Sequence, residues 1–99
     1  MISARIESDL AIPPGELLEE ELEERGMSQI ELARRMGRPR QKINEIIKGK
    51  RAITPATALQ LEQVLGISAR LWLGLETDYR LTLARQGAEA GANNLTARR

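Results

Sequence analysis

Cysteine, histidine and phenylalanine are all missing from the 99 residues of this sequence. Without cysteine no disulfide can form, and without cysteine or histidine there is no thiolate or imidazole to bind a metal ion. The same absences exclude the Ser-His and Cys-His pairs of nucleophilic catalysis. The carboxylates are spread over predicted helix surfaces, and no acid–base pair marks a pocket. We therefore expect no catalytic residues, no metal and no cofactor.

Long hydrophobic runs are also missing. No stretch approaches the roughly 18 apolar residues that a membrane span needs. Arg5, Glu7 and Asp9 interrupt the N-terminal segment, where a signal peptide would be apolar. Together with the lack of cysteine, these features predict a cytoplasmic protein that has no membrane partner.

The residues that are abundant are typical of helices. Leucine, alanine, glutamate, arginine and glutamine dominate the sequence, and all of them have high helix propensity. Hydrophobic residues form 41% of the chain, which is enough for a small packed core. We expect one all-α domain over residues 14–85, with an N-terminal arm over 1–13. The Gly, Ala, Asn and Arg residues of 86–99 show no period and predict a disordered tail.

Charge is segregated along the chain, although the formal net charge is only +1. Residues 1–26 hold two basic and eight acidic residues, whereas residues 27–52 hold eight basic and two acidic residues. A basic block within a nearly neutral chain is expected of a nucleic-acid-binding face. Taken alone, the block is equally consistent with a solvated helix surface.

Capping residues and the spacing of apolar residues predict five helices. They are expected over residues 16–25, 28–36, 39–48, 55–65 and 69–85. Ser28 with Glu31 fits a capping box, in which each side chain satisfies a free backbone N–H of the first turn. Thr54 fits an N-cap, with Pro55 at the first helical position.

The second and third predicted helices form a helix-turn-helix. The small side chain of Ala33 lets the second helix approach closely, and Gly37 supplies the turn. Ile43 and Ile46 lock the third helix, the predicted recognition helix, onto the core. Arg38 departs from this pattern, since an apolar residue is usual at that position.

Several segments resemble known families. The sequences MSQIELA at residues 27–33 and GKR at 49–51 resemble the Cro and phage-repressor (XRE) class of DNA-binding domains. A narrower resemblance to HigA-type antitoxins covers about residues 12–85. It is carried by residues 14–16, 43–55 and 71–73 and by Tyr79. Gly74 and Glu76 stand where that family more often has Asn and Gln.

The resemblance implies two activities. A HigA-type protein represses its own operon as a homodimer on double-stranded operator DNA, and it silences a HigB-type toxin, an RNA-cleaving protein that acts at the ribosome. Two alternatives remain. The chain could be a stand-alone XRE regulator without a toxin partner, or a protein-interaction module without a DNA role, against which the basic block argues.

The predicted recognition helix supplies the candidate DNA contacts, because its N-terminal residues meet base edges in the major groove. Arg40, Gln41 and Asn44 are the predicted base readers, since arginine suits guanine and the amides suit adenine. Glu45 could accept a hydrogen bond from cytosine or orient a neighbouring cation, and both interpretations stay open. The predicted phosphate contacts, with Gln29 assigned from the family resemblance, are Gln29, Lys42, Lys48, Lys50 and Arg51.

Two further surfaces suggest protein partners. The predicted helix over 69–85 has more apolar residues than one face can hold, which favours a homodimer interface at Trp72, Leu75 and Tyr79. Alternatively, this helix simply crosses a small domain. The acidic helix over 16–25 would repel phosphate, so it should face away from DNA. A basic toxin could bind it by charge complementarity, or it could be a solvated face.

Overall fold

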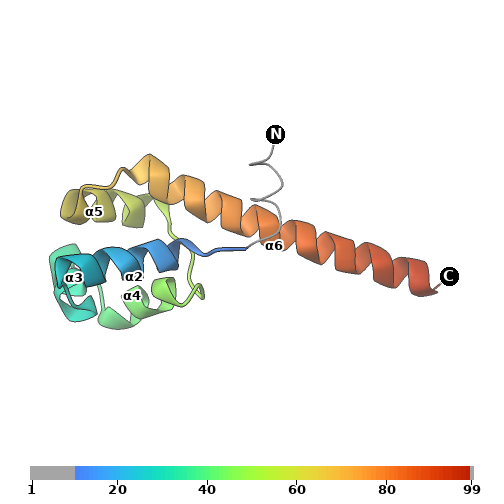
Figure 1. Ribbon diagram of the computed structural model, residues 1–99, viewed down its shortest axis with the longest axis horizontal. Helices are drawn as coiled ribbons and strands as arrows, with labels where there is room; N and C mark the ends of the chain where they lie inside the picture. The colour runs from blue at the N-terminus through green and yellow to red at the C-terminus, as the bar shows by residue number, and fades with distance from the viewer. Residues whose placement is uncertain (1–10, 99) are drawn as a thin grey trace.

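The computed structural model describes residues 11–98, with side chains as far as Ala88 (Figure 1). This part of the chain forms five helices: α2 (Pro14–Arg25), α3 (Gln29–Met36), α4 (Arg40–Ile47), α5 (Pro55–Leu65) and α6 (Ala69–Arg98). The prediction of an all-α fold with five helices is confirmed. None of the described helices is long and apolar enough to cross a membrane. Most of the predicted N-terminal arm lies outside the described residues.

Side-chain caps begin two helices at the residues that the sequence predicts. The Ser28 hydroxyl accepts a hydrogen bond from the Glu31 backbone N–H at 3.0 Å, and the Thr54 hydroxyl accepts one at 3.3 Å from the N–H three residues later. Each bond satisfies a donor that the first turn of a helix leaves free. The capping box is only half formed, because among the described residues the Glu31 carboxylate pairs with Arg34 and Arg35.

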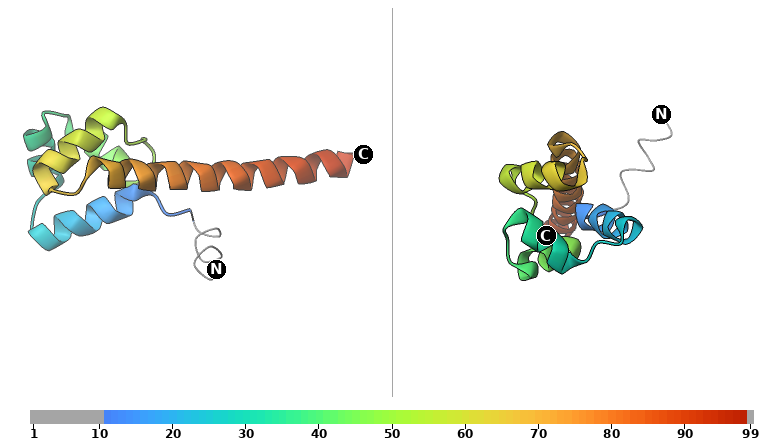
Figure 2. Two further views of the ribbon diagram at one scale, coloured as in Figure 1. Left: turned by 90° about the horizontal axis from the view of Figure 1, so that it is seen from above. Right: turned by 90° about the vertical axis from the view of Figure 1, so that its left-hand side faces the viewer.

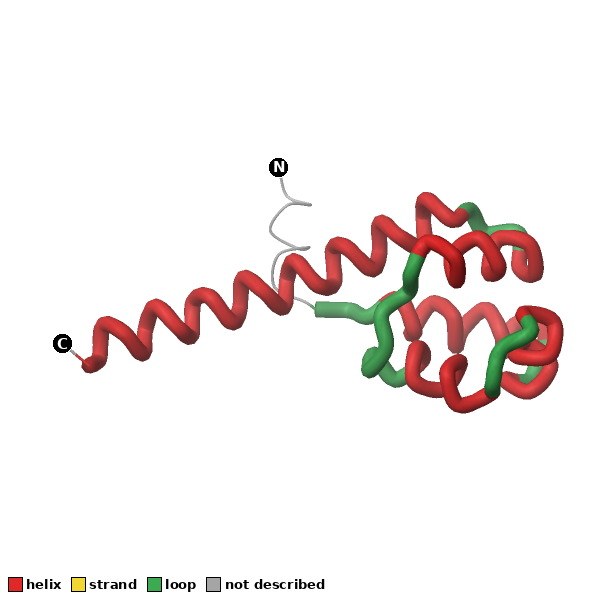
Figure 3. Tube along the Cα trace, turned by 180° about the vertical axis from the view of Figure 1, so that it is seen from behind, coloured by secondary structure: helices red, strands yellow, loops and turns green. Residues whose placement is uncertain are grey.

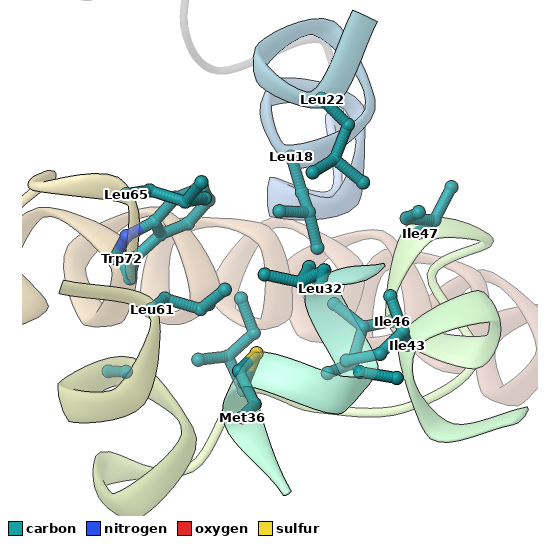
Figure 4. Close-up of a cluster of buried hydrophobic side chains, with 13 residues drawn as sticks. Leu18, Leu22, Leu32, Met36, Ile43, Ile46, Ile47, Leu61, Leu65 and Trp72 are labelled. Carbon is teal, nitrogen blue, oxygen red and sulfur yellow. The ribbon is translucent and has the colours of Figure 1, made fainter. Parts of the chain in front are cut away.

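All five helices contribute to one hydrophobic core (Figure 4). Its buried members are Leu18, Leu22, Leu32, Ala33, Met36, Ile43, Ile46, Ile47, Ile53, Ala58, Leu61, Leu65 and Trp72. Figure 4 shows Leu18 of α2 pointing toward Leu32 of α3, with Ile43 and Ile46 of α4 beyond it. Because burying one such side chain contributes about 1.5–3 kcal/mol, this cluster fixes α4 against the rest of the domain.

Helix α6 is longer than the sequence pattern indicates. The apolar pattern ends near Arg85, and a disordered tail is expected from Gln86, but the helix continues to Arg98. The correction has a simple origin, because alanine, glutamine and leucine in this segment have high helix propensity even without an apolar stripe. Figures 1 and 2 show the second half of α6 projecting away from the other four helices. The described part of the chain measures 54 × 32 × 22 Å along its principal axes.

Candidate nucleic-acid interface

The turn between α3 and α4 holds these helices as a helix-turn-helix. Gly37 ends α3 with a φ of 67°, in the left-handed region that glycine adopts at little cost. The Arg38 backbone N–H donates to the Ala33 carbonyl at 3.0 Å, and its guanidinium donates to the Gln60 side chain of α5. The unusual charged residue in the turn is therefore accommodated by a bond to a neighbouring helix.

Helix α4 is buried on one face and exposed on the other. Ile43, Ile46 and Ile47 lie in the core, while Arg40 and Gln41 are exposed at the N-terminal end of the helix. A recognition helix presents this end to base edges. The geometry is consistent with the predicted base readers, and contact of these two residues with DNA stays a prediction.

A close contact with α2 also positions α4, and it depends on a residue for which the sequence pattern predicts no packing role. A Cβ added at Gly15 would lie 2.2 Å from the carbonyl oxygen of Ile46 and 2.5 Å from that of Ile47. No side chain fits there, so the first turn of α2 rests directly on the backbone of α4. The signal in the sequence is the glycine after Pro14, within the segment that resembles HigA-type antitoxins.

Two predicted DNA contacts lie together across the helix-turn-helix. Asn44 of α4 donates from Nδ2 to Oε1 of Gln29, the first residue of α3, at 3.3 Å. Both side chains are half-buried. This bond connects a predicted base reader with a predicted phosphate contact, so the two would meet the duplex as one unit.

Glu45 is the most connected side chain of the exposed α4 face. Its carboxylate accepts hydrogen bonds from Arg51 Nε at 2.7 Å and from Gln41 Nε2 at 3.3 Å. The hydrogen bond from Arg51 is the main cause that holds the pKa of the Glu45 carboxyl below its ordinary value, although desolvation acts in the opposite direction. Of the two roles predicted for Glu45, these contacts favour the orientation of its neighbours.

The remaining predicted phosphate contacts lie on α4 and in the turn that follows it. Lys48, Lys50 and Arg51 are exposed, and Lys42 is half-buried. Gly49 makes the turn possible with a φ of 76°. Within the part of the chain that the structure describes, the three lysines form no ion pair. Their charges are therefore available to a polyanion.

Residues of α6 contact the segment between α4 and α5 and hold it in place. Glu76 is only 7% exposed, and its Oε1 accepts a hydrogen bond from the Ile53 backbone N–H at 3.1 Å. Its other oxygen pairs with Arg80. A Cβ at Gly49 would lie 3.4 Å from the Tyr79 hydroxyl, so the tyrosine touches the turn. Figure 3 shows the α4–α5 connection running beside α6. The sequence does not predict this support, because Glu76 and Ile53 are 23 residues apart.

One residue of the predicted dimer interface is placed elsewhere. Trp72 is 0% exposed and lies inside the chain's own core, so its side chain cannot form a dimer surface. Its side chain lies beside Leu61 and Leu65 of α5 instead (Figure 4). Leu75 and Tyr79 are half-buried. Part of the apolar excess of α6 thus packs in the core, through Trp72 and the partly buried Leu73.

Comparison with known proteins places this geometry in a family. The helix-turn-helix family matches residues 18–72. Virulence-associated protein I of Dichelobacter nodosus is 41% identical over 81 residues, which cover 81% of this chain and 75% of that protein.

Solved structures with the same fold include two antitoxins. An addiction module antidote protein of a HigA family from Coxiella burnetii is 33% identical, with a TM-score of 0.75 over 84% of this chain and 91% of that one. The Pseudomonas aeruginosa antitoxin HigA, solved with the higBA promoter, is 29% identical, with a TM-score of 0.78 over 86% of this chain and 94% of that one. The chain described here belongs to the XRE-type helix-turn-helix family of DNA-binding regulators, which are not enzymes, and it is related to the HigA antitoxins.

Proposed function

We propose that the protein is an antitoxin that represses its own toxin–antitoxin operon and neutralises a HigB-type toxin. The proposed DNA binding rests on the outer surface of α4. Arg40, Gln41 and Asn44 lie on this surface, and the buried isoleucines of the helix hold it in the core. Lys42, Lys48 and Lys50 flank this surface, form no ion pair among the described residues and would contact phosphates. Such a protein would act in the cytoplasm, where bacterial operators lie.

Operator binding of this kind requires two copies of the chain. A two-fold symmetric dimer presents its recognition helices about 34 Å apart, one turn of B-DNA. The middle of α6, around Leu81 and Leu83, is the part that we assign to self-association, because both leucines are exposed apolar side chains. Leu81 is 44% exposed and Leu83 is 37% exposed on this part of the helix. A second copy of the chain would bury both.

The toxin partner is supported by the relationship to HigA antitoxins. The surface that binds it is a separate proposal, for which charge complementarity favours α2. Glu19, Glu20, Glu23 and Glu24 are exposed on this helix and pair with no cation among the described residues. A small basic protein encoded next to this gene and co-purified with the chain would support the antitoxin assignment. Failure of that neighbour to bind would leave a stand-alone regulator.

The DNA assignment is tested by removing two base readers together. The double variant Arg40→Ala/Gln41→Ala should lose at least about 2 kcal/mol of affinity for the promoter upstream of its own gene, since each base contact contributes about 1–3 kcal/mol. Electrophoretic mobility shift measures the loss. The matched control, Gln63→Ala/Arg70→Ala, removes the same groups from exposed positions outside α4. Equal promoter affinity of the two variants would contradict the proposal.

A further inference from the structure

Glu45 places a carboxylate on the face of α4 that would meet DNA. Oε1 accepts a hydrogen bond from Arg51 Nε at 2.7 Å, and Oε2 accepts one from Gln41 Nε2 at 3.3 Å. A carboxylate close to a phosphate backbone is unfavourable unless a cation neutralises it. Arg51 supplies that cation from within the chain.

The bond to Glu45 also fixes which way the Gln41 amide points. An ionised carboxylate only accepts hydrogen bonds, so the amide must turn its NH₂ group toward it. The carbonyl oxygen of Gln41 and its second N–H then remain free on the exposed side. This pair of groups matches adenine, whose N6 donates and whose N7 accepts in the major groove.

The backbone of the turn is held independently of the Glu45 side chain. The Glu45 carbonyl oxygen accepts hydrogen bonds from the N–H groups of Lys50 at 2.8 Å and Arg51 at 3.3 Å. A substitution that preserves the helix therefore leaves the turn in place. The effect of such a substitution reports on the carboxylate alone.

We propose that Glu45 is a specificity-determining residue that acts through its neighbours, orienting Gln41 as an adenine reader and holding Arg51, without touching a base. Arg51 is then the partner of Glu45 and not a phosphate contact. This selects one of the two interpretations of Glu45 and revises the assignment of Arg51. The inference rests on the proposed operator binding and adds the residue that sets the base preference.

The test compares four full-length proteins: wild type, Glu45→Gln, Arg51→Ala and the double variant. Lys50→Ala, in the same turn, is the matched control. Fluorescence anisotropy measures the affinity of each protein for the promoter DNA upstream of its own gene and for a scrambled duplex of equal composition. Thermal unfolding followed by circular dichroism establishes that each variant is folded.

Glu45→Gln should bind the scrambled duplex more tightly, because a negative charge is removed, and should lower the operator-to-scrambled affinity ratio about three- to tenfold. Arg51→Ala should lower this ratio by a similar factor. The double variant should lower it no further than either single one, because the two residues act as a pair. Lys50→Ala should weaken both duplexes equally, since phosphate contacts carry no sequence information.

Single-base substitutions through the operator complete the test. They should reveal one position where wild type prefers adenine and Glu45→Gln does not. Loss of a cytosine preference instead would make Glu45 a base reader and overturn the inference. Equal weakening of both duplexes by Arg51→Ala would do the same, because Arg51 would then be a phosphate contact. Both results would leave operator binding intact, whereas wild-type protein without operator preference would overturn the proposed function and this inference together.

Discussion

Replacing Gly15 with alanine tests how tightly α2 holds the recognition helix. The new Cβ would lie 2.2 Å from the Ile46 carbonyl oxygen and 2.6 Å from the Ile47 Cα. Both are backbone atoms, so no side-chain rotation can relieve the contact. The first turn of α2 and the end of α4 must move apart. We expect Gly15→Ala to lower the free energy of unfolding and to weaken DNA binding.

The magnitude follows from two opposing effects. Overpacking a close-packed core costs about 1–3 kcal/mol, and a clash with backbone belongs in the upper part of that range. Alanine has a higher helix propensity than glycine, which offsets at most about 1 kcal/mol. The net loss of about 1–2 kcal/mol should lower the Tm by roughly 4–16 °C, because 1 kcal/mol shifts the Tm of a domain of this size by about 4–8 °C.

Gly74 provides the matched control. It lies within α6 and has no atom within 4 Å of an added Cβ. Gly74→Ala should therefore raise the free energy of unfolding by about 0.5–1 kcal/mol. Circular dichroism melts of the two variants measure opposite shifts if α2 rests on α4 as described. An equal rise in Tm for both variants would refute the close contact at Gly15.

Two further predictions concern α6. Glu76→Ala should cost about 1–3 kcal/mol in thermal unfolding, because it leaves the buried Ile53 N–H without an acceptor. Glu76→Gln keeps an acceptor and should cost less, so equal losses would argue against this role. Leu83→Asp should shift the protein from dimer to monomer in sedimentation equilibrium, because it places a charge in the proposed interface. Leu71→Asp, at an exposed leucine in the first turn of α6, should remain dimeric, and wild-type monomer at micromolar concentration would contradict the interface.

The features that the sequence predicts correctly depend on near neighbours. Ser28 and Thr54 cap the helices that follow them, because the bonds they make span only three residues. Ile43 and Ile46 are buried as their helical spacing indicates. Gly37 ends α3 as predicted, because a left-handed residue after a helix is a local requirement.

The features that the sequence does not predict depend on distant contacts. An excess of apolar residues on a helix indicates that more than one of its sides is buried. It does not tell whether each side packs against the same chain, as Trp72 does, or against a second chain. Gly15 has no apolar or charge pattern to mark it, since its role is to lack a side chain opposite α4. Glu76 is an ordinary helix former until the fold brings the Ile53 N–H to it.

The structure also reduces the number of cations available to DNA. Of the eight basic residues in 27–52, four are bonded within the chain: Arg34, Arg35, Arg38 and Arg51. Four form no ion pair among the described residues: Arg40, Lys42, Lys48 and Lys50.

Three of these cations, Lys42, Lys48 and Lys50, are predicted phosphate contacts, whereas Arg40 is a predicted base reader. A dimer would therefore neutralise about six phosphates. Counterion release then predicts a slope of about −5 for log K against log salt concentration, from about −0.9 per phosphate. Fluorescence anisotropy with the promoter over a range of salt concentrations measures this slope. A slope of about −13 would mean that the other basic residues of the block also contact phosphates and that the internal pairs open on binding. A slope of about −3 would mean that one subunit binds alone.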